Sequence, residues 1–127
     1  MDHSVLAGRR VLLVEDELMV AMLVEAALED EHCTIVGPFG DVTGALAAAR
    51  SEDLDLAVLD INLAGEMVFP VAEVLAGRGV PFLLLSGYGA VGLPRDRQHW
   101  QVCGKPFRLE ELVSRLSNLM TAVPPVQ

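Results

Sequence analysis

The chain has 127 residues, of which 52% are hydrophobic, and this suits a single domain that buries a core of its own. Its 18 acidic and 9 basic residues give a net charge of −9, which disfavours nucleic acid as a partner because such binding needs a basic face. No apolar run approaches the roughly 20 residues of a membrane span, and the N-terminus lacks a signal-peptide pattern, so we expect a soluble cytoplasmic protein with no membrane partner.

Short apolar runs alternate with stretches of helical periodicity along the chain. In chain order, the pattern predicts a strand at 11–14, a helix at 18–28, a strand within 33–40 that Gly37 and Pro38 end, a helix at 42–49, a strand at 56–59, a helix at 70–76, a strand at 80–85, a weak strand at 100–103 and a helix at 109–120. Strands that are apolar throughout and alternate with helices are typical of a parallel sheet covered on both faces. We therefore predict a doubly wound α/β fold with a five-stranded parallel sheet.

The segment between Ser86 and Lys105 leaves little room for a helix. Its 18 residues must hold a loop, a helix, a second loop and the fifth strand, and they are rich in glycine and proline. Glycine costs roughly 1 kcal/mol relative to alanine inside a helix, and proline about 3 kcal/mol. We predict that the fourth helix of this fold is short, distorted or absent.

Four of the five predicted strands lead directly into residues that bind ions or form hydrogen bonds. Glu15, Asp16 and Glu17 follow the first strand, Asp60 ends the third, Ser86 ends the fourth and Lys105 follows the fifth. Ligands of open parallel sheets bind outside the carboxyl ends of the strands, so these groups are expected to share one crevice. The second strand leads only into glycine, proline and phenylalanine, which places it at the margin of the sheet.

This set of side chains indicates phosphoryl chemistry. Clustered carboxylates repel one another unless a cation lies among them, and a few hard oxygen ligands suit Mg²⁺, which readily shares its coordination shell with a phosphate. A carboxylate can itself attack phosphorus, and phosphoryl transfer depends mainly on positioning and charge neutralisation. We infer that an aspartate forms an acyl phosphate, with Mg²⁺ and Lys105 holding the phosphoryl oxygens.

Four segments in this order resemble the receiver domain of two-component response regulators: "VLLVEDE" at 11–17, "LAVLDINL" at 56–63, "LLLSGYG" at 83–89 and "VCGKPF" at 102–107. The resemblance spans residues 9–121, with 1–8 as an N-terminal extension and 122–127 as a tail, and it implies the strand order 2-1-3-4-5. "LLLSGYG" also resembles the aromatic-Ala-Thr-Gly-Tyr motif of receivers that are often single-domain and partnered with a distinctive subfamily of histidine kinases. Here leucine replaces the aromatic and the alanine, and Ser86 replaces the threonine.

The resemblance implies a role for each acidic residue. Asp60 would accept the phosphoryl group from a histidine kinase. Asp16 and Asp60 would bind Mg²⁺ directly, together with the backbone carbonyl of Asn62, and Glu15 would act through water. Glu17 is interpreted as a residue at a helix N-terminus, where the helix dipole favours a negative charge.

The resemblance also implies a switch. Ser86 would be the switch hydroxyl, Lys105 would contact the phosphoryl group, and a cis peptide bond would precede Pro106. Many receivers carry a phenylalanine or tyrosine three residues before the lysine, where this chain has Val102. We hypothesise that Tyr88, two residues after Ser86, replaces that missing switch aromatic.

We therefore predict a stand-alone receiver that is phosphorylated on Asp60 with Mg²⁺ and signals through protein contacts. It would be a phosphoacceptor with Mg²⁺-dependent self-phosphorylation and possible autodephosphorylation, and not an enzyme. Its partners would be a histidine kinase or a phosphotransfer protein and a downstream protein, since no residues remain for a DNA-binding domain after the last helix. The alternative is a degenerate receiver that acts only as a protein-interaction module, or a phosphate sink.

Two other classes agree less well with the residues. An aspartyl-phosphate phosphohydrolase needs an Asp-x-Asp pair at the end of the first strand and a cap domain, but the nucleophile candidate here lies on the third strand and no residues remain for a cap. A flavin carrier must cradle a phosphate in its first loop, where Glu15, Asp16 and Glu17 would repel it.

Overall fold

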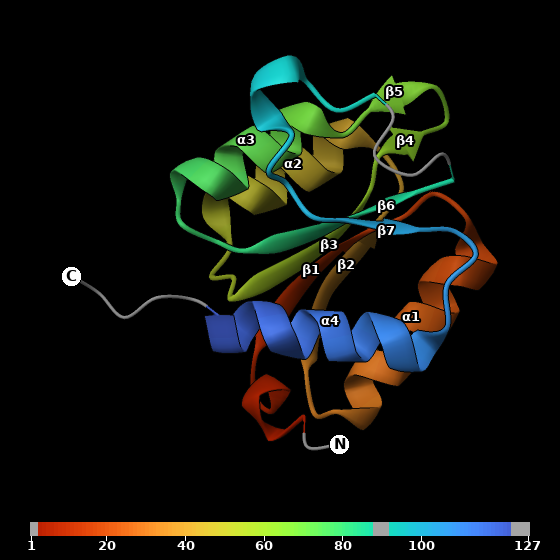
Figure 1. The fold of residues 1–127 in the computed structure, drawn as a ribbon, viewed down its shortest axis with the longest axis vertical. Helices are drawn as coiled ribbons and strands as arrows, with labels where there is room; N and C mark the ends of the chain where they lie inside the picture. The colour runs from red at the N-terminus through yellow and green to blue at the C-terminus, as the bar shows by residue number, and fades with distance from the viewer. Residues whose placement is uncertain (1–2, 88–91, 123–127) are drawn as a thin grey trace.

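A computed structural model describes residues 3–87 and 92–122, and these form a sheet with helices on both faces (Figure 1). The strands are β1 (Arg10–Val14), β2 (Thr34–Phe39), β3 (Leu56–Asp60), β4 (Asn62–Leu63), β5 (Glu66–Met67), β6 (Phe82–Ser86) and β7 (Val102–Gly104). The helices are α1 (Leu18–Asp30), α2 (Val42–Ser51), α3 (Phe69–Gly77) and α4 (Leu109–Ala122), with short 3-10 turns η1 (Ser4–Leu6) and η2 (Arg95–Arg97). Among the described residues, no helix is long and apolar enough to cross a membrane.

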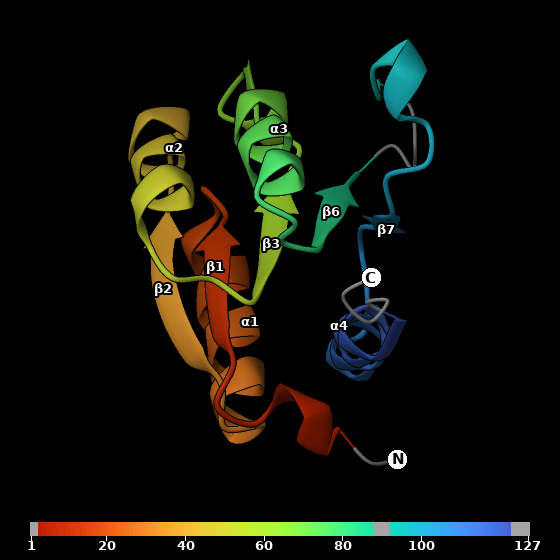
Figure 2. The same cartoon turned by 90° about the vertical axis from the view of Figure 1, so that its left-hand side faces the viewer.

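The main sheet has five parallel strands in the order β2-β1-β3-β6-β7, which confirms the predicted order 2-1-3-4-5 (Figure 2). Strands β1, β3 and β6 are apolar apart from Arg10, Asp60 and Ser86 at their ends, as expected of strands that helices cover on both faces. Strand β2 lies at one edge and is only partly buried, as expected from the absence of polar site residues after it. The prediction that Gly37 and Pro38 end this strand is wrong, since β2 continues through an irregularity to Phe39, which pairs with Val14; an edge strand tolerates proline. The fifth strand, β7, begins two residues later than predicted.

Each face of the sheet has its own hydrophobic core. Successive side chains of a strand point to opposite faces, so Leu12 and Leu59 pack toward α2 and α3, whereas Leu13 and Val58 pack toward α1 and α4. Leu6 of η1 is fully buried in the second of these cores. The two cores hold the strands rigidly, and the loops at their carboxyl ends are therefore well positioned.

The chain between β6 and β7 contains no α-helix among residues 92–101; its helical content there is η2, a single 3-10 turn. For the described part of the segment this agrees with the prediction of a short, distorted or absent fourth helix, whereas residues 88–91 lie outside the described residues. The segment is nevertheless attached to α3. Trp100 is buried against Phe69 and Phe82, and Arg97 forms two hydrogen bonds of 2.9 Å with Glu73.

A small antiparallel hairpin, β4–β5, follows β3, and the sequence pattern did not predict it. Its strands have two residues each, and its loop consists of Ala64 and Gly65. Two residues are too few to show an alternating pattern, and Ala-Gly lacks the Asn-Gly or Asp-Gly signal of a tight hairpin turn.

Helices α1 and α3 end in the same way but with different residues. After α1, the N–H of Cys33 donates to the carbonyl of Leu28 at 3.0 Å, and His32 between them has a φ angle of 67°. After α3 the equivalent residue is Gly79, with a φ angle of 75°. This helix ending requires a left-handed residue, which glycine adopts without strain and histidine does not.

Replacing exposed His32 with glycine is therefore expected to raise the free energy of unfolding by about 1 kcal/mol. Gly79→Ala should lower it by a similar amount, and urea unfolding of both variants measures the two effects. An unchanged or lower stability of His32→Gly would contradict this reading of the helix end.

Candidate functional site

The crevice predicted from the strand ends is present at the carboxyl edge of the sheet. Glu15 and Asp16 follow β1, Asp60 ends β3, Ser86 ends β6 and Lys105 follows β7. Parallel strands bring their carboxyl ends to one edge, so residues up to 90 positions apart in the chain become neighbours.

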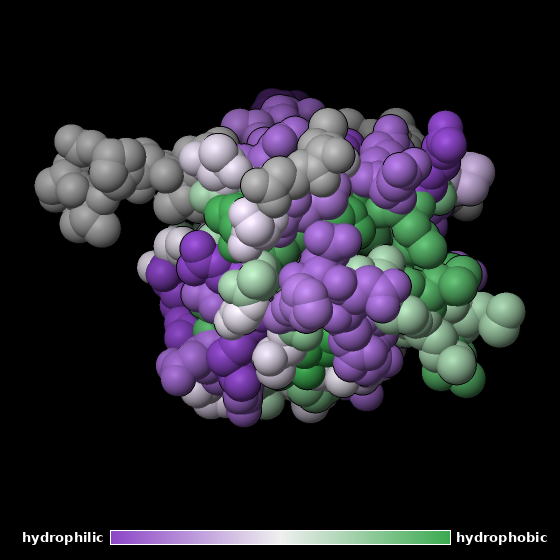
Figure 3. Space-filling model, turned by 90° about the horizontal axis from the view of Figure 1, so that it is seen from below, coloured by the Kyte–Doolittle hydropathy of each residue, from purple (hydrophilic) through white to green (hydrophobic). Residues whose placement is uncertain are grey.

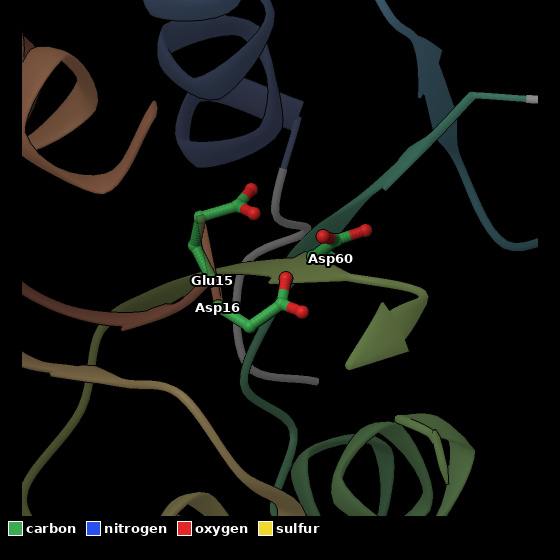
Figure 4. A group of neighbouring side chains, drawn as sticks. All are labelled: Glu15, Asp16 and Asp60. Atoms are coloured by element: carbon green, nitrogen blue, oxygen red, sulfur yellow. The ribbon is translucent and has the colours of Figure 1, made fainter. Parts of the chain in front are cut away.

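Three carboxyl groups gather at the centre of this crevice. Glu15, Asp16 and Asp60 each offer an oxygen, and these oxygens lie within 4.8 Å of one another. Figure 4 shows the three groups turned toward the same space from the ends of β1 and β3. Glu15 and Asp60 are 3% and 5% exposed, whereas Asp16 is exposed and opens the cluster to solvent.

Lys105 supplies the cation that faces these carboxylates. Its Nζ lies 3.1 Å from Asp60 Oδ2, with hydrogen-bond geometry, and 3.2 Å from Glu15 Oε2. It also lies 3.7 Å from Glu17 Oε1. Glu17 is the N-cap of α1, so its interpretation as a residue at a helix N-terminus is correct. The sequence did not indicate its contact with Lys105.

Backbone hydrogen bonds hold the crevice in place. The N–H of Glu15 donates to the carbonyl of Phe39 at 2.9 Å, and the N–H of Lys105 donates to the carbonyl of Ser86 at 2.7 Å. The peptide bond between Lys105 and Pro106 is cis, as the resemblance implied. The loops after β1 and β7 are therefore tied to their neighbouring strands.

Burial and interactions between the charged groups shift the pKa values of Glu15 and Lys105. Burial, followed by hydrogen bonding and repulsion from Asp60, raises the pKa of Glu15 from 4.5 to about 7. Burial alone would lower the pKa of Lys105, but its hydrogen bond and attraction to Asp60, together with Glu15, outweigh burial and raise that pKa. The site therefore keeps a cation at Lys105 and carries a proton on Glu15 below neutral pH.

The free energy of unfolding should fall as the pH rises, because of Glu15. Between the ordinary pKa of 4.5 and the raised pKa of about 7, the folded protein holds a proton that the unfolded chain has released. The loss should total about 3 kcal/mol without divalent metal, because the pKa is raised by about 2.5 units and one unit corresponds to about 1.4 kcal/mol.

Glu15→Gln should remove this pH dependence, which urea unfolding at about pH 5 and about pH 8 measures, whereas Glu29→Gln on the exposed side of α1 should keep it. Equal pH dependence in the wild type and Glu15→Gln would contradict the assignment.

Three predicted residues concern the switch: Ser86 and Val102 are described by the structure, and Tyr88 is not. Ser86 is buried at the end of β6, opposite Gly104 of β7. Tyr88 lies outside the described residues, so its role as a substitute aromatic stays a hypothesis. Val102 is half-buried and packs against the core beneath α2 and α3, so β7 presents an aliphatic side chain where many receivers have a ring.

The donor set suits a hard divalent cation. Three carboxyl groups provide the oxygen ligands that Mg²⁺ prefers. Buried Glu15 Oε2 makes an ion pair with Lys105 but has no hydrogen bond within the described part of the chain. Asn62 is exposed two residues after Asp60, and its N–H donates to Asp60 Oδ1 at 3.4 Å, which places the peptide unit between Ile61 and Asn62 beside the cluster.

The fold and the site together define a doubly wound α/β protein with an acidic pocket and one lysine at the carboxyl edge of its sheet. Residues 11–117 match the family model of the response regulator receiver domain, and the chain belongs to this family. Receivers are signalling domains, and this chain is homologous to response regulators of two-component systems.

Relatives and solved structures agree with this assignment. The transcriptional regulatory protein TcrA of Mycobacterium tuberculosis is 37% identical over 93% of this chain, which corresponds to 48% of TcrA. The chain thus spans about half the length of the curated relatives it matches. SdrG of Sphingomonas melonis Fr1 is 33% identical with a TM-score of 0.76, over 96% of this chain and 100% of SdrG.

A third comparison bears on the metal. The receiver domain of the sensor histidine kinase PA1611 of Pseudomonas aeruginosa PAO1 is 25% identical with a TM-score of 0.73, over 91% of this chain and 100% of that domain. Its structure has a magnesium ion coordinated in the active-site cleft.

Proposed function

We propose that this receiver accepts a phosphoryl group on Asp60 from the phosphohistidine of a histidine kinase, in a reaction that requires Mg²⁺. The observation that carries the proposal is the 3.1 Å contact of Lys105 Nζ with Asp60 Oδ2, inside a cluster of three carboxyl groups. A cation already touches the candidate nucleophile, where an incoming phosphoryl group would bring further negative charge.

The phosphoryl group moves from a nitrogen of the donor to an oxygen of Asp60, and no third reactant is consumed in this step. An oxygen of the Asp60 carboxylate attacks phosphorus, and a P–O bond forms to give an acyl phosphate. The P–N bond of the phosphohistidine breaks, and its electron pair returns to the imidazole nitrogen. The domain is itself modified in this step, so it acts as an acceptor rather than as a multiple-turnover enzyme.

Asp16 and Asp60, with the backbone carbonyl of Asn62, would hold Mg²⁺, and Glu15 would act through water. When bound, the ion neutralises charge on the phosphoryl oxygens. Lys105 holds its proton across the physiological pH range because the pKa is raised. It therefore remains available as a donor to a phosphoryl oxygen on Asp60.

The surface next to Asp60 supports docking of the kinase along α1. Leu18 and Met19 of α1 are 71% and 74% exposed, and Figure 3 shows apolar side chains gathered on the side of the molecule where α1 lies. A groove of about 420 Å³ is lined by Leu23 and Phe107 together with Glu17 and Lys105. A helix of the kinase seated in this groove would lie beside Lys105, which contacts Asp60.

Phosphorylation of Asp60 would be transmitted to a downstream protein through a change in the surface near the site. The dianion on Asp60 would draw Ser86 and Lys105 inward, and this would bias the chain between β6 and β7 that a downstream protein contacts. A full shift from 1:99 to 99:1 needs about 5.5 kcal/mol of differential interaction. Two charge-assisted hydrogen bonds of about 1.5–3 kcal/mol each, with a metal contact, are sufficient for that.

The test uses phosphoramidate, a small phosphodonor with the same kind of P–N bond. Intact-mass measurement should show one added phosphoryl group on the wild type with Mg²⁺ and none on Asp60→Asn. Chelation of Mg²⁺ should prevent the addition on the wild type. Phosphorylation of Asp60→Asn at the wild-type level would overturn the proposal, and so would a wild type that no phosphodonor modifies, which is the behaviour of a degenerate receiver.

A further inference from the structure

The hairpin of β4 and β5 begins two residues after Asp60. Its loop residues, Ala64 and Gly65, have φ angles of 53° and 95°. Positive φ angles at both loop positions define a type I′ turn, which favours asparagine, aspartate or glycine at its first position. Alanine is strained there, and a hairpin with two residues in each strand has little stability of its own. Something besides the loop sequence must hold this turn.

The side chain of Asn62 provides that support. Its Oδ1 accepts a hydrogen bond of 2.7 Å from the N–H of Gly65, and so closes the turn from the first strand of the hairpin. The residues on either side of Asn62 are held by the core, since Ile61 is 5% exposed and Leu63 is 3% exposed. The carbonyl of Ile61 also accepts from the N–H of Val68 at 2.9 Å, at the base of the hairpin.

The same residue adjoins the acceptor site through its backbone. The N–H of Asn62 donates to Asp60 Oδ1, and the carbonyl of Asn62 belongs to the next peptide unit, within β4, so movement of the hairpin would move this carbonyl relative to Asp60. A carbonyl ligand binds a metal well only when the chain that carries it is held in one place, and groups that orient ligands strongly affect affinity.

The geometry points to Asn62 as a positioning residue for the metal site. Its side chain holds the β4–β5 turn, and the turn keeps the Asn62 backbone carbonyl available to Mg²⁺. This inference rests on the proposed function, which places the ion beside Asp16 and Asp60. Because Oδ1 of Asn62 is already bonded to Gly65, the side chain acts through the turn and not as a ligand.

The first test compares Mg²⁺ affinity of the wild type and Asn62→Ala by titration calorimetry without any phosphodonor. Asn62→Ala should bind Mg²⁺ about tenfold more weakly, as for other residues that orient metal ligands. Cross-strand nuclear Overhauser contacts between residues 63 and 66 should weaken in the same variant. Since Asn62 is exposed, the Asn62→Ala variant should keep a thermal unfolding temperature close to that of the wild type.

A second variant separates an effect through the turn from direct ligation by the side chain. Ala64→Asn creates Asn-Gly, the strongest type I′ pair. The double variant Asn62→Ala with Ala64→Asn should regain the cross-strand contacts and come within about twofold of the wild-type Mg²⁺ affinity. Failure to regain affinity when the contacts return would overturn the inference, as would wild-type affinity in Asn62→Ala.

Asp16→Asn serves as the control for the metal site itself. If Asp16→Asn lowers Mg²⁺ affinity and Asn62→Ala does not, the positioning role of Asn62 is wrong and the proposed site stands. If neither variant changes Mg²⁺ affinity, the proposed site is wrong, and the inference about Asn62 falls with it.

Discussion

Lys105→Met is expected to lower the free energy of unfolding near pH 8 by about 3 kcal/mol, because it leaves buried carboxylates without their cation. Lys105 Nζ lies within 3.2 Å of oxygens on both Glu15 and Asp60, and its side chain is only 19% exposed. Methionine is one atom shorter than lysine and keeps an unbranched apolar stem, but it removes the charge. Urea unfolding without divalent metal measures the effect.

Two comparisons make this prediction specific. Adding Glu15→Gln to Lys105→Met should restore much of the loss, because it removes one of the two buried carboxylates that the lysine neutralises. Arg97→Met, which breaks a half-exposed pair with Glu73, should lower the free energy of unfolding clearly less than Lys105→Met does, because solvent screens this pair. If Lys105→Met were no more destabilising than Arg97→Met, the site could not depend on this cation as described.

Asp16→Asn is expected to raise the Mg²⁺ concentration for half-maximal phosphorylation of Asp60 by about 100-fold, the upper end of the effect seen for residues that merely orient ligands. Asp16 is the exposed member of the three-carboxylate cluster, so its amide variant should leave the fold intact. Phosphoramidate labelling at increasing Mg²⁺ concentrations measures the shift.

The matched control is Glu66→Gln, which also removes one exposed carboxylate near the site but lies on β5, outside the cluster. It should leave the Mg²⁺ requirement within about twofold of the wild type because a solvated charge outside the coordination shell is strongly screened. Equal shifts in the two variants would mean that general surface charge, and not ligation by Asp16, governs Mg²⁺ binding.

The predicted crevice could be located from sequence because it depends on one topological rule. Once apolar runs are assigned as parallel strands, the residues after them must share an edge, and this places Asp60 beside Lys105 without knowledge of any side-chain conformation. The edge position of β2 followed from the same rule. The shortened helical segment before β7 could be predicted from helix propensities, because these depend only on the local sequence.

Features that depend on contacts between side chains could not be predicted. The contact of Glu17 with Lys105 joins residues far apart in sequence and depends on the conformation of both long side chains. The raised pKa of Glu15 depends on burial at the sheet edge. Trp100 was assigned to a strand, but it precedes β7 and packs on Phe82, because a large aromatic ring fills the space beside α3.

The hairpin after Asp60 escaped prediction for a different reason. Its turn is held by a side chain, since the Asn62 hydrogen bond to Gly65 replaces the usual preference of the loop residues. Sequence rules for hairpins consider the loop positions, and Ala64 at the first of them argues against a type I′ turn. The structure is therefore essential for assigning a role to the side chain of Asn62, whereas the resemblance concerns only its backbone carbonyl.

The measurement that bears most directly on the account is chemical mapping of the phosphorylated residue. Protein labelled with phosphoramidate and Mg²⁺ is reduced with borohydride, which converts an aspartyl phosphate to homoserine, and the peptides are sequenced by mass spectrometry. The account predicts homoserine at position 60 alone. Homoserine at Asp16, or a stable phosphate on a serine or histidine with residue 60 unchanged, would contradict it.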